Sequence, residues 1–339
     1  MLLHNSHLAP FRSPLGPAKA GSVVRIAFLS DTATAIILRI WMGDERSFPM
    51  LQDGNTWTYA LQVPEITGIL WYDFLVYLPD GKTVRYGAPE DGLGGEGHVQ
   101  ADSVHSFQLT VYQPDFETPD FLHGATIYQI FPDRFCKAKT RSVDRRKDRV
   151  MQAWDEDLLV YPDPMCTENR TDNFYGGTLN GIREKLPYLH DLGVDVLYLN
   201  PIFEARSNHR YDTADYTRID PMLGTASEFE QLCGEAEKLG MRILLDGVFS
   251  HTGNDSLYFN AYGTYPGKGA CQGPDSPYYD WYTFEHFPDR YRCWWGFHSL
   301  PEIRESTPSF QRFILGPSGV VPSWLRRGAS GWRLDVADE

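Results

Sequence analysis

The sequence lacks the features that mark membrane, secreted and disulfide-rich proteins. No apolar run approaches the ~18 residues that a membrane-spanning helix needs. The N-terminus has no charged segment followed by an apolar one, so we expect no signal peptide. The five cysteines are odd in number and have no metal-motif spacing, which favours reduced thiols. We therefore expect a cytoplasmic protein without a membrane partner.

Basic residues are also scarce. The 31 Lys and Arg residues are outnumbered by 45 Asp and Glu residues, which gives a formal net charge of -14. Nucleic acids and anionic membranes bind basic surfaces, so we expect neither as a partner. Aromatic residues, by contrast, are plentiful at 14%. Trp and Tyr fill cores but also form flat surfaces on which neutral ligands stack, and the composition leaves both uses open.

Residues 1–118 have the pattern of an all-β domain. Short β-branched or alternating apolar runs are separated by turn residues, without a helical period. Strands at this spacing predict a β-sandwich. A Pro-rich connector at 114–119 predicts the domain boundary. The strands are expected at 23–28, 36–41, 57–63, 70–77 and 83–86.

From residue 119 onward, apolar strands alternate with helical periods. This alternation predicts parallel βα units, here the first four of a (β/α)8 barrel over residues 119–339. The stretch 252–308 is too long for a simple loop and is rich in Tyr, Trp, Gly and Pro, so we expect an inserted subdomain after the third strand. The expected strands are 125–131, 194–202, 241–249 and 331–336, and the expected helices are 178–192, 225–239 and 322–327.

Polar side chains follow the last three predicted barrel strands. Because the carboxyl ends of parallel strands meet at one face of a barrel, an active site is expected there. Each residue alone also has a structural interpretation, such as a buried acid, a loop histidine or a salt bridge. Because such residues follow three successive strands, a purely structural role for all of them together is unfavourable. The residues are Tyr211, Asp212, Asp246, His251, Arg333 and Asp335.

These segments resemble the α-amylase superfamily, glycoside hydrolase family 13, in its neopullulanase, cyclomaltodextrinase and maltogenic amylase branch. The segments 127–135 and 173–177 resemble the first barrel strand and the loop before the first barrel helix, and 246–251 and 331–339 resemble two signature regions. The resemblance implies retaining hydrolysis of α-1,4 bonds in maltooligosaccharides, cyclodextrins, starch or pullulan, with α-1,6 bonds and transfer left open. The alternatives are a non-catalytic glucan-binding module and a subunit-interface module that forms a homodimer through the N-terminal domain.

The resemblance assigns catalytic roles to two residues and a structural role to a third. Asp335 matches the nucleophile, whose carboxylate attacks the anomeric carbon and forms a covalent glucosyl ester. Arg333 lies two residues earlier on the same strand face, where its positive charge would keep Asp335 ionised. Asp246 matches a structural acid that orients its neighbours.

The resemblance also assigns a substrate-binding set. His251 matches a hydrogen-bond donor to the cleaved glucose, and Tyr211 matches the ring that stacks under that sugar. Asp212, beside Tyr211, belongs to the same set. Trp294 and Trp295, in the expected insertion, are candidates for glucan contacts, with a role in the core equally open.

A retaining glycosidase also needs a general acid/base, a second carboxyl group about 5–5.5 Å from the nucleophile. The resemblance places it on a strand beyond the signature at 331–339, and no residue of this chain matches it. Glu339 lies within that signature. We therefore expect an incomplete reading frame or cloned fragment that is inactive alone. Its barrel side chains would be incompletely packed at Leu197, Leu199, Leu244, Val248 and Leu334.

No cofactor is required, and the usual ligands for calcium are missing. The family often has Asn where this chain has Ser250, and the related branch has Asn and Asp where it has Cys136 to Lys139. Hydroxyl and ammonium groups are poor substitutes for the carbonyl and carboxylate oxygens that calcium prefers. We therefore assign no metal ligand in this chain and leave calcium open.

Overall fold

The computed structural model describes residues 1–100, 105–139, 149–155 and 171–338. Contacts divide the chain into two units, Met1–Thr118 and Pro119–Glu339. None of the helices within the described ranges is long and apolar enough to cross a membrane. Four cysteines are free thiols, as expected, and Cys166 lies outside the described residues; the four are Cys136, Cys233, Cys271 and Cys293.

The N-terminal unit contains two sheets, antiparallel except where β3 joins β12. The five-stranded sheet comprises β1 (Leu2–Leu3), β2 (Arg12–Ser13), β4 (Val23–Ser30), β7 (Leu51–Asp53) and β8 (Thr56–Gln62). The seven-stranded sheet comprises β3 (Ala18–Lys19), β5 (Ala35–Met42), β6 (Asp44–Pro49), β9 (Gly68–Tyr77), β10 (Thr83–Gly87), β11 (His98–Gln100) and β12 (Phe107–Tyr112). All the strands expected from the sequence are present.

One buried cluster draws side chains from both N-terminal sheets. Phe28 and Trp57 come from the five-stranded sheet, and Tyr72, Phe74 and Phe107 from the seven-stranded sheet. Successive side chains of a strand point to opposite faces, so buried and half-buried positions alternate along β5. This alternation is the physical reason that the strands could be read from the sequence.

A four-stranded parallel sheet forms the centre of the C-terminal unit, with order β13 (Ile127–Ile130), β16 (Val196–Leu199), β19 (Arg242–Gly247) and β22 (Gly331–Leu334). These are the four expected barrel strands. Apolar side chains of the helices belong to the same buried cluster as those of the strands. The helices are α1 (Leu179–Glu184), α2 (Leu186–Asp191), α3 (Ala226–Lys238), α4 (Pro308–Leu315) and α5 (Val320–Arg326).

Two helix predictions need correction. The helix expected at 178–192 is divided into α1 and α2 at Lys185. Pro187 is the reason, because it has no N–H for the carbonyl four residues earlier and its ring clashes with that group. Helix α4 was not predicted, although Pro308 at its first turn is a favourable start signal. By contrast, Thr225 and Glu228 form the expected capping box of α3.

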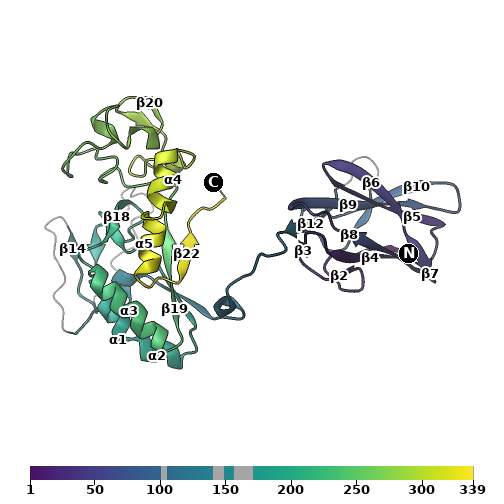
Figure 1. Cartoon of the computed structure of the whole chain (residues 1–339), viewed down its shortest axis with the longest axis horizontal. Helices are drawn as coiled ribbons and strands as arrows, with labels where there is room; N and C mark the ends of the chain where they lie inside the picture. The colour runs from purple at the N-terminus through teal and green to yellow at the C-terminus, as the bar shows by residue number, and fades with distance from the viewer. Residues whose placement is uncertain (101–104, 140–148, 156–170, 339) are drawn as a thin grey trace. The chain divides into compact units, whose positions relative to one another are not determined.

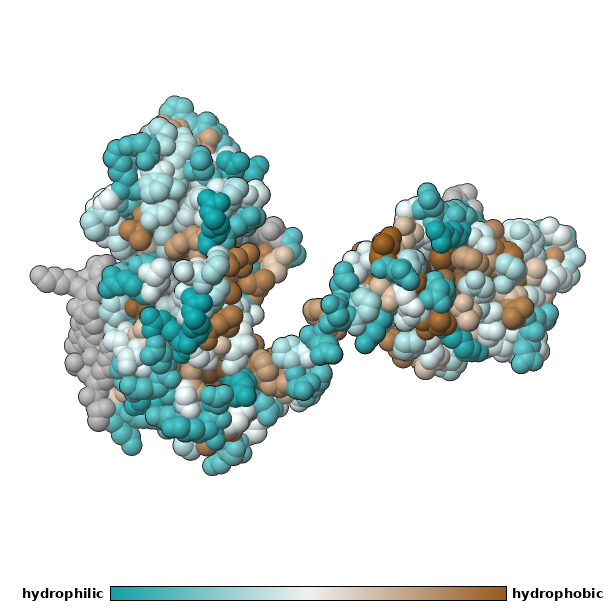
Figure 2. All heavy atoms as spheres, viewed as in Figure 1, coloured by the Kyte–Doolittle hydropathy of each residue, from teal (hydrophilic) through white to brown (hydrophobic). Residues whose placement is uncertain are grey.

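The prediction of incomplete packing was wrong for Leu197, Leu199 and Val248, which are buried. Leu197 and Leu199 belong to the cluster shared with the helices, so their burial does not depend on further strands. Leu244 is half-buried. Leu334, on the edge strand β22, is 55% exposed as expected. Figure 2 shows hydrophobic residues on the surface near this strand.

Irregular segments and short strands lie between these elements. The hairpin of β17 (Phe203–Ala205) and β18 (Thr213–Ile219) follows β16 and was not predicted. After β19, the expected insertion contains η3 (Ala270–Gln272), η4 (Tyr279–Trp281), β20 (Phe284–His286), β21 (Arg290–Tyr291) and η5 (Trp294–Gly296), and lies at the opposite end of the unit from α2 (Figure 1). The remaining elements are η1 (Asp120–Leu122), η2 (Pro132–Arg134), β14 (Val150–Met151) and β15 (Asn173–Phe174).

Candidate active site

The register of β19 and β22 places Asp246 opposite Arg333. Neighbouring residues in parallel strands point to the same face, and Arg333 Nη1 donates to Asp246 Oδ1 at 3.1 Å. Asp335 follows the end of β22, where its backbone N–H donates to the Gly247 carbonyl at 3.2 Å. The Asp335 carboxylate accepts from the same Arg333 nitrogen. One guanidinium therefore bridges two carboxylates at the end of the sheet.

Two tyrosines bind the other oxygen of Asp246. Tyr211 donates to Asp246 Oδ2 at 3.0 Å, and Tyr198 on β16 donates to the same atom. Burial raises the pKa of Asp246 because it penalises the charged form, while Tyr198, Arg333 and Tyr211 act in the opposite direction. Burial, followed by the Asp246 charge, raises the pKa of Tyr211 to about 12. The Arg333 pKa is also raised, because its hydrogen bonds and the negative charge of Asp246 outweigh desolvation.

A line of amides extends this cluster to the first strand. Gln129 on β13 donates to Asn200 Oδ1 at 2.8 Å, and Asn200 donates to the Tyr211 hydroxyl at 3.4 Å. All four strands or the residues directly after them thus contribute polar groups. Sequence reasoning missed Gln129, Tyr198 and Asn200. Their signal was a polar group at alternate positions of otherwise apolar strands.

His251 lies in a second group with the insertion. Its Nδ1 is 3.0 Å from the Ser250 hydroxyl, and its ring stacks on Trp294 with centroids 5.3 Å apart. Trp294 in turn stacks on Trp295 at 5.4 Å. Trp295 is 76% exposed, and Trp294 is half-buried. The core role left open for these residues therefore does not apply to Trp295.

Asp212 is turned into its own loop. Its carboxylate accepts from the Ser207 backbone N–H at 3.1 Å and from the Ser207 hydroxyl. Of the predicted site residues, the structure joins Tyr211, Asp246, Arg333 and Asp335 by hydrogen bonds. Asp212 directly follows Tyr211 in the sequence, but its carboxylate is bound within its own loop.

Polar side chains at or near the positions considered for calcium have partners within the protein. The Ser250 hydroxyl is engaged with the His251 ring. Asp133, which precedes the stretch Cys136 to Lys139, accepts backbone hydrogen bonds from Tyr175 at 3.0 Å and Gly176 at 3.1 Å. Over the described ranges, no three His, Cys, Asp or Glu side chains are grouped to hold a metal ion.

A parallel sheet with helices packed against it places this unit in the α/β class, in which polar groups at the carboxyl ends of the strands form the usual ligand site. Residues 129–339 match the model of the α-amylase catalytic domain. The chain therefore belongs to the α-amylase family, as its signature segments indicated.

Curated relatives agree with this assignment. The chain is 40% identical over 382 residues to an amylopullulanase of Thermoanaerobacterium thermosulfurigenes, an alignment that covers 100% of this chain and 20% of the relative. It is 34% identical over 280 residues to neopullulanase 2 of Thermoactinomyces vulgaris, covering 79% of this chain and 42% of the relative. The chain thus spans less than half the length of either relative.

Solved structures show the same relationship. The type III pullulan hydrolase from Thermococcus kodakarensis matches with a TM-score of 0.58 and 26% identity, covering 100% of this chain and 56% of that chain. A cyclomaltodextrinase matches with a TM-score of 0.61 and 25% identity, covering 99% of this chain and 55% of that one.

Proposed function

We propose that this chain supplies the nucleophile side of the active site of a retaining α-glucan hydrolase. The observation that carries the proposal is Arg333, which bridges Asp246 and Asp335 at the end of the parallel sheet. The guanidinium charge favours the ionised form of Asp335, the form that can attack. Asp246, held by two tyrosines, keeps the arginine in place.

In the proposed reaction, Asp335 attacks the anomeric carbon while the glycosidic carbon–oxygen bond breaks. The leaving oxygen takes a proton from a general acid, and water then hydrolyses the glucosyl ester with net retention. Asp246 is poorly placed to be that acid, because its two oxygens already accept hydrogen bonds from Arg333, Tyr198 and Tyr211. The proton donor must therefore come from another carboxyl group.

Aromatic surfaces support a glucan as the substrate class. Tyr211 lies beside Asp246, while Trp294 and Trp295 extend from His251 as a stack. The faces of sugar rings are apolar enough to pack on such rings. The names of the relatives, amylopullulanase and neopullulanase, support α-glucosidic bonds, and we propose α-1,4 linkages with α-1,6 linkages as a further substrate.

The 339-residue chain alone is proposed to be inactive, since among its described residues the hydrogen-bonded cluster contains only two carboxyl groups, the proposed nucleophile Asp335 and the poorly placed Asp246. General acid catalysis typically contributes ~10²–10⁴-fold. The assay is reducing-sugar release from maltooligosaccharides, cyclodextrins and pullulan by the purified chain. We expect none above the uncatalysed rate, and turnover normal for an amylase would contradict the proposal.

The paired test uses a completed enzyme, meaning a polypeptide that carries residues 1–339 and continues through further barrel strands, its own or those of a relative. We expect this protein to release sugars that retain the anomeric configuration. Proton NMR of the first products measures that configuration. Inverted products would contradict a covalent intermediate on Asp335.

A second candidate function, glucan binding by the N-terminal unit, has one supporting observation. Trp41 on β5 and Trp71 on β9 are directly opposite in the ladder, and neither is buried. Affinity electrophoresis of the whole chain in starch gels tests it. Retardation that disappears in the Trp41→Ala, Trp71→Ala double variant would support binding there, and unchanged mobility would oppose it.

A further inference from the structure

The residue before Tyr211 has an unusual backbone. Arg210 has φ of 62°, in the left-handed region that L-residues with long side chains rarely adopt. It lies in the loop between β17 and β18, which also carries Ser207 and Asp212. A change in this one dihedral would rotate the chain that carries Tyr211. The loop therefore needs contacts that hold Arg210 in place.

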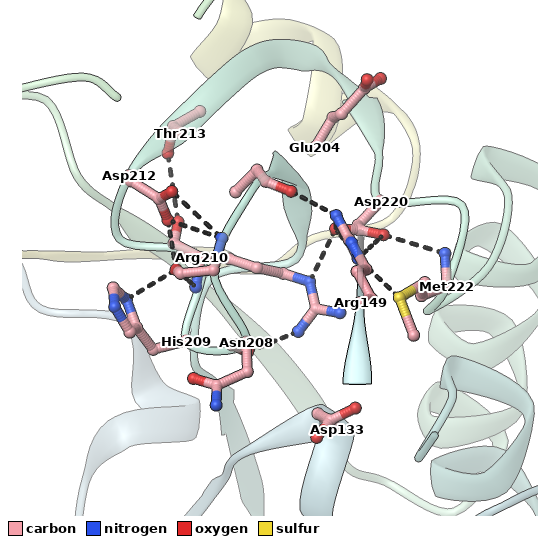
Figure 3. Close-up of polar contacts among 12 residues, drawn as sticks. Asp133, Arg149, Glu204, Asn208, His209, Arg210, Asp212, Thr213, Asp220 and Met222 are labelled. Atoms are coloured by element: carbon pink, nitrogen blue, oxygen red, sulfur yellow. Dashed lines mark hydrogen bonds and ion pairs between the residues drawn. The ribbon is translucent and has the colours of Figure 1, made fainter. Parts of the chain in front are cut away.

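Those contacts come from the Arg210 side chain. Its Nε is 3.1 Å from Asp220 Oδ2, and its Nη1 donates to the Asn208 carbonyl at 2.7 Å. The guanidinium lies over the Phe174 ring at 5.7 Å. Arg210 and Asp220 are both buried, so the ion pair is shielded from water and salt. Figure 3 shows Arg210 reaching from the loop toward Asp220.

Asp220 is itself fixed. It follows the end of β18 and accepts from the Met222 backbone N–H at 2.9 Å. Arg149 donates to it through Nη1 and Nη2, each at 3.3 Å. The anchor for Arg210 is thus a carboxylate that the far end of the same hairpin holds in position.

We propose that Arg210 and Asp220 are positioning residues for Tyr211: their ion pair holds the Arg210 backbone in its left-handed conformation and thereby keeps the Tyr211 hydroxyl on Asp246. The ion pair thereby maintains the 3.0 Å hydrogen bond that the Tyr211 hydroxyl donates to Asp246. Its catalytic consequence rests on the proposed function. The positioning itself does not, so the two can be tested separately.

The direct test follows Tyr211 in the whole 339-residue chain labelled with ¹³Cζ-tyrosine, with the Tyr211 NMR line assigned from a Tyr211→Phe variant. Two substitutions divide the contributions. Arg210→Ala removes the ion pair and keeps the steric cost of the left-handed backbone, whereas Arg210→Gly removes the ion pair and that cost together. Asp220 keeps Arg149 as a partner in both variants, so neither leaves a buried carboxylate alone.

A matched control removes another arginine–carboxylate pair from the same hairpin. Arg218 on β18 pairs with Glu204 on β17 at 3.3 Å, and neither residue lies in the loop that carries Tyr211. Arg218→Ala should leave the Tyr211 line unmoved. Arg210→Ala should move it and lower the Tyr211 pKa from about 12 toward 10, and Arg210→Gly should move it less.

If Arg210 merely stabilises the fold, both Arg210 variants lower the urea midpoint while the Tyr211 line of the folded protein stays where it is. That result would overturn the proposal, as would equal shifts in Arg218→Ala. In the completed enzyme, Arg210→Ala should lower kcat/KM by roughly 10- to 100-fold, the loss that ~1 Å misplacement produces. A shifted Tyr211 line without loss of activity would contradict the substrate-binding role assigned to Tyr211 while leaving the positioning intact.

Discussion

Two clusters in the C-terminal unit use the same arginine and aspartate chemistry and differ in exposure. Around Asp220, the Arg149 and Arg210 side chains are 2% and 1% exposed. Around Asp246, the Arg333 side chain is 41% exposed and that of Asp335 is 13% exposed. The Asp220 cluster is closed to ligands, whereas the Asp335 carboxylate of the Asp246 cluster is accessible to solvent.

The difference separates a scaffold from a reactive group. A buried ion pair whose partners satisfy one another fixes backbone segments, and removing one partner leaves an uncompensated charge. A partly exposed pair is worth less to stability, because water and salt screen it. The Asp246 cluster contains both a scaffold and a reactive group. Asp246 is buried and fixed by its hydrogen bonds, and Arg333, which binds Asp246, also binds and positions Asp335.

The largest effect is expected from Asp335→Asn in the completed enzyme. Asn has nearly the same shape but cannot attack as an anion, so turnover should fall by roughly 10⁴-fold or more while glucan binding persists. Initial rates and equilibrium binding of a maltooligosaccharide measure the two quantities. Activity within tenfold of the unmodified enzyme would remove Asp335 from the role of nucleophile.

The contributions of the two clusters to stability can be compared through two substitutions in the 339-residue chain, Asp220→Asn and Asp246→Asn. Asp220→Asn removes the buried carboxylate that Arg149 and Arg210 share and should cost about 3–5 kcal/mol in the free energy of unfolding. Asp246→Asn should cost only about 1 kcal/mol, because Arg333 keeps Asp335 as a partner. Urea unfolding followed by circular dichroism gives both values, and equal losses would break the distinction between the clusters.

A smaller effect is expected in the pH dependence of stability. The raised pKa of Asp246 means that the folded chain binds this proton more tightly than the unfolded chain. As pH rises from 3.8 through the raised value, this group's contribution to the free energy of unfolding should therefore fall, and above that range it should be constant. Asp246→Asn should lack this slope. A difference curve that rises with pH would show that the pKa is lowered.

The smallest effect is expected from chelation. Two nearby carboxylates, Asp246 and Asp335, could attract a cation, but Arg333 already neutralises part of their charge. EDTA should leave the melting temperature of the completed enzyme unchanged. A drop of many degrees that calcium restores would show a metal site built from other residues.

The sequence predicted the elements with simple periodicity and missed those defined by local chemistry or distant contacts. The four parallel strands and the α3 capping box were recognisable because burial imposes a regular pattern. The division of the 178–192 helix followed from Pro187, a residue whose effect could have been anticipated. The β17–β18 hairpin is too short and irregular to produce a clear alternation.

The site was predictable to a similar degree. The signature residues Asp246, Arg333 and Asp335 were recognised, and their hydrogen bonds place them together. The support from Gln129, Tyr198 and Asn200 was missed, because their signal, a polar group at alternate positions of an apolar strand, is weak when it covers only one or two residues of that strand. The Arg210–Asp220 pair could not be predicted. Its role depends on the positive φ of Arg210 and on a contact between two residues that are ten positions apart.

Covalent trapping on the completed enzyme tests the central claim most directly. A fluorinated glucosyl fluoride slows hydrolysis of the glucosyl ester, so the intermediate accumulates and can be located by peptide mass spectrometry. We predict a single glucosyl adduct on the peptide that carries Asp335, absent in Asp335→Asn. An adduct on any other residue, or complete turnover with inversion and no adduct, would contradict the assignment of Asp335 as the nucleophile.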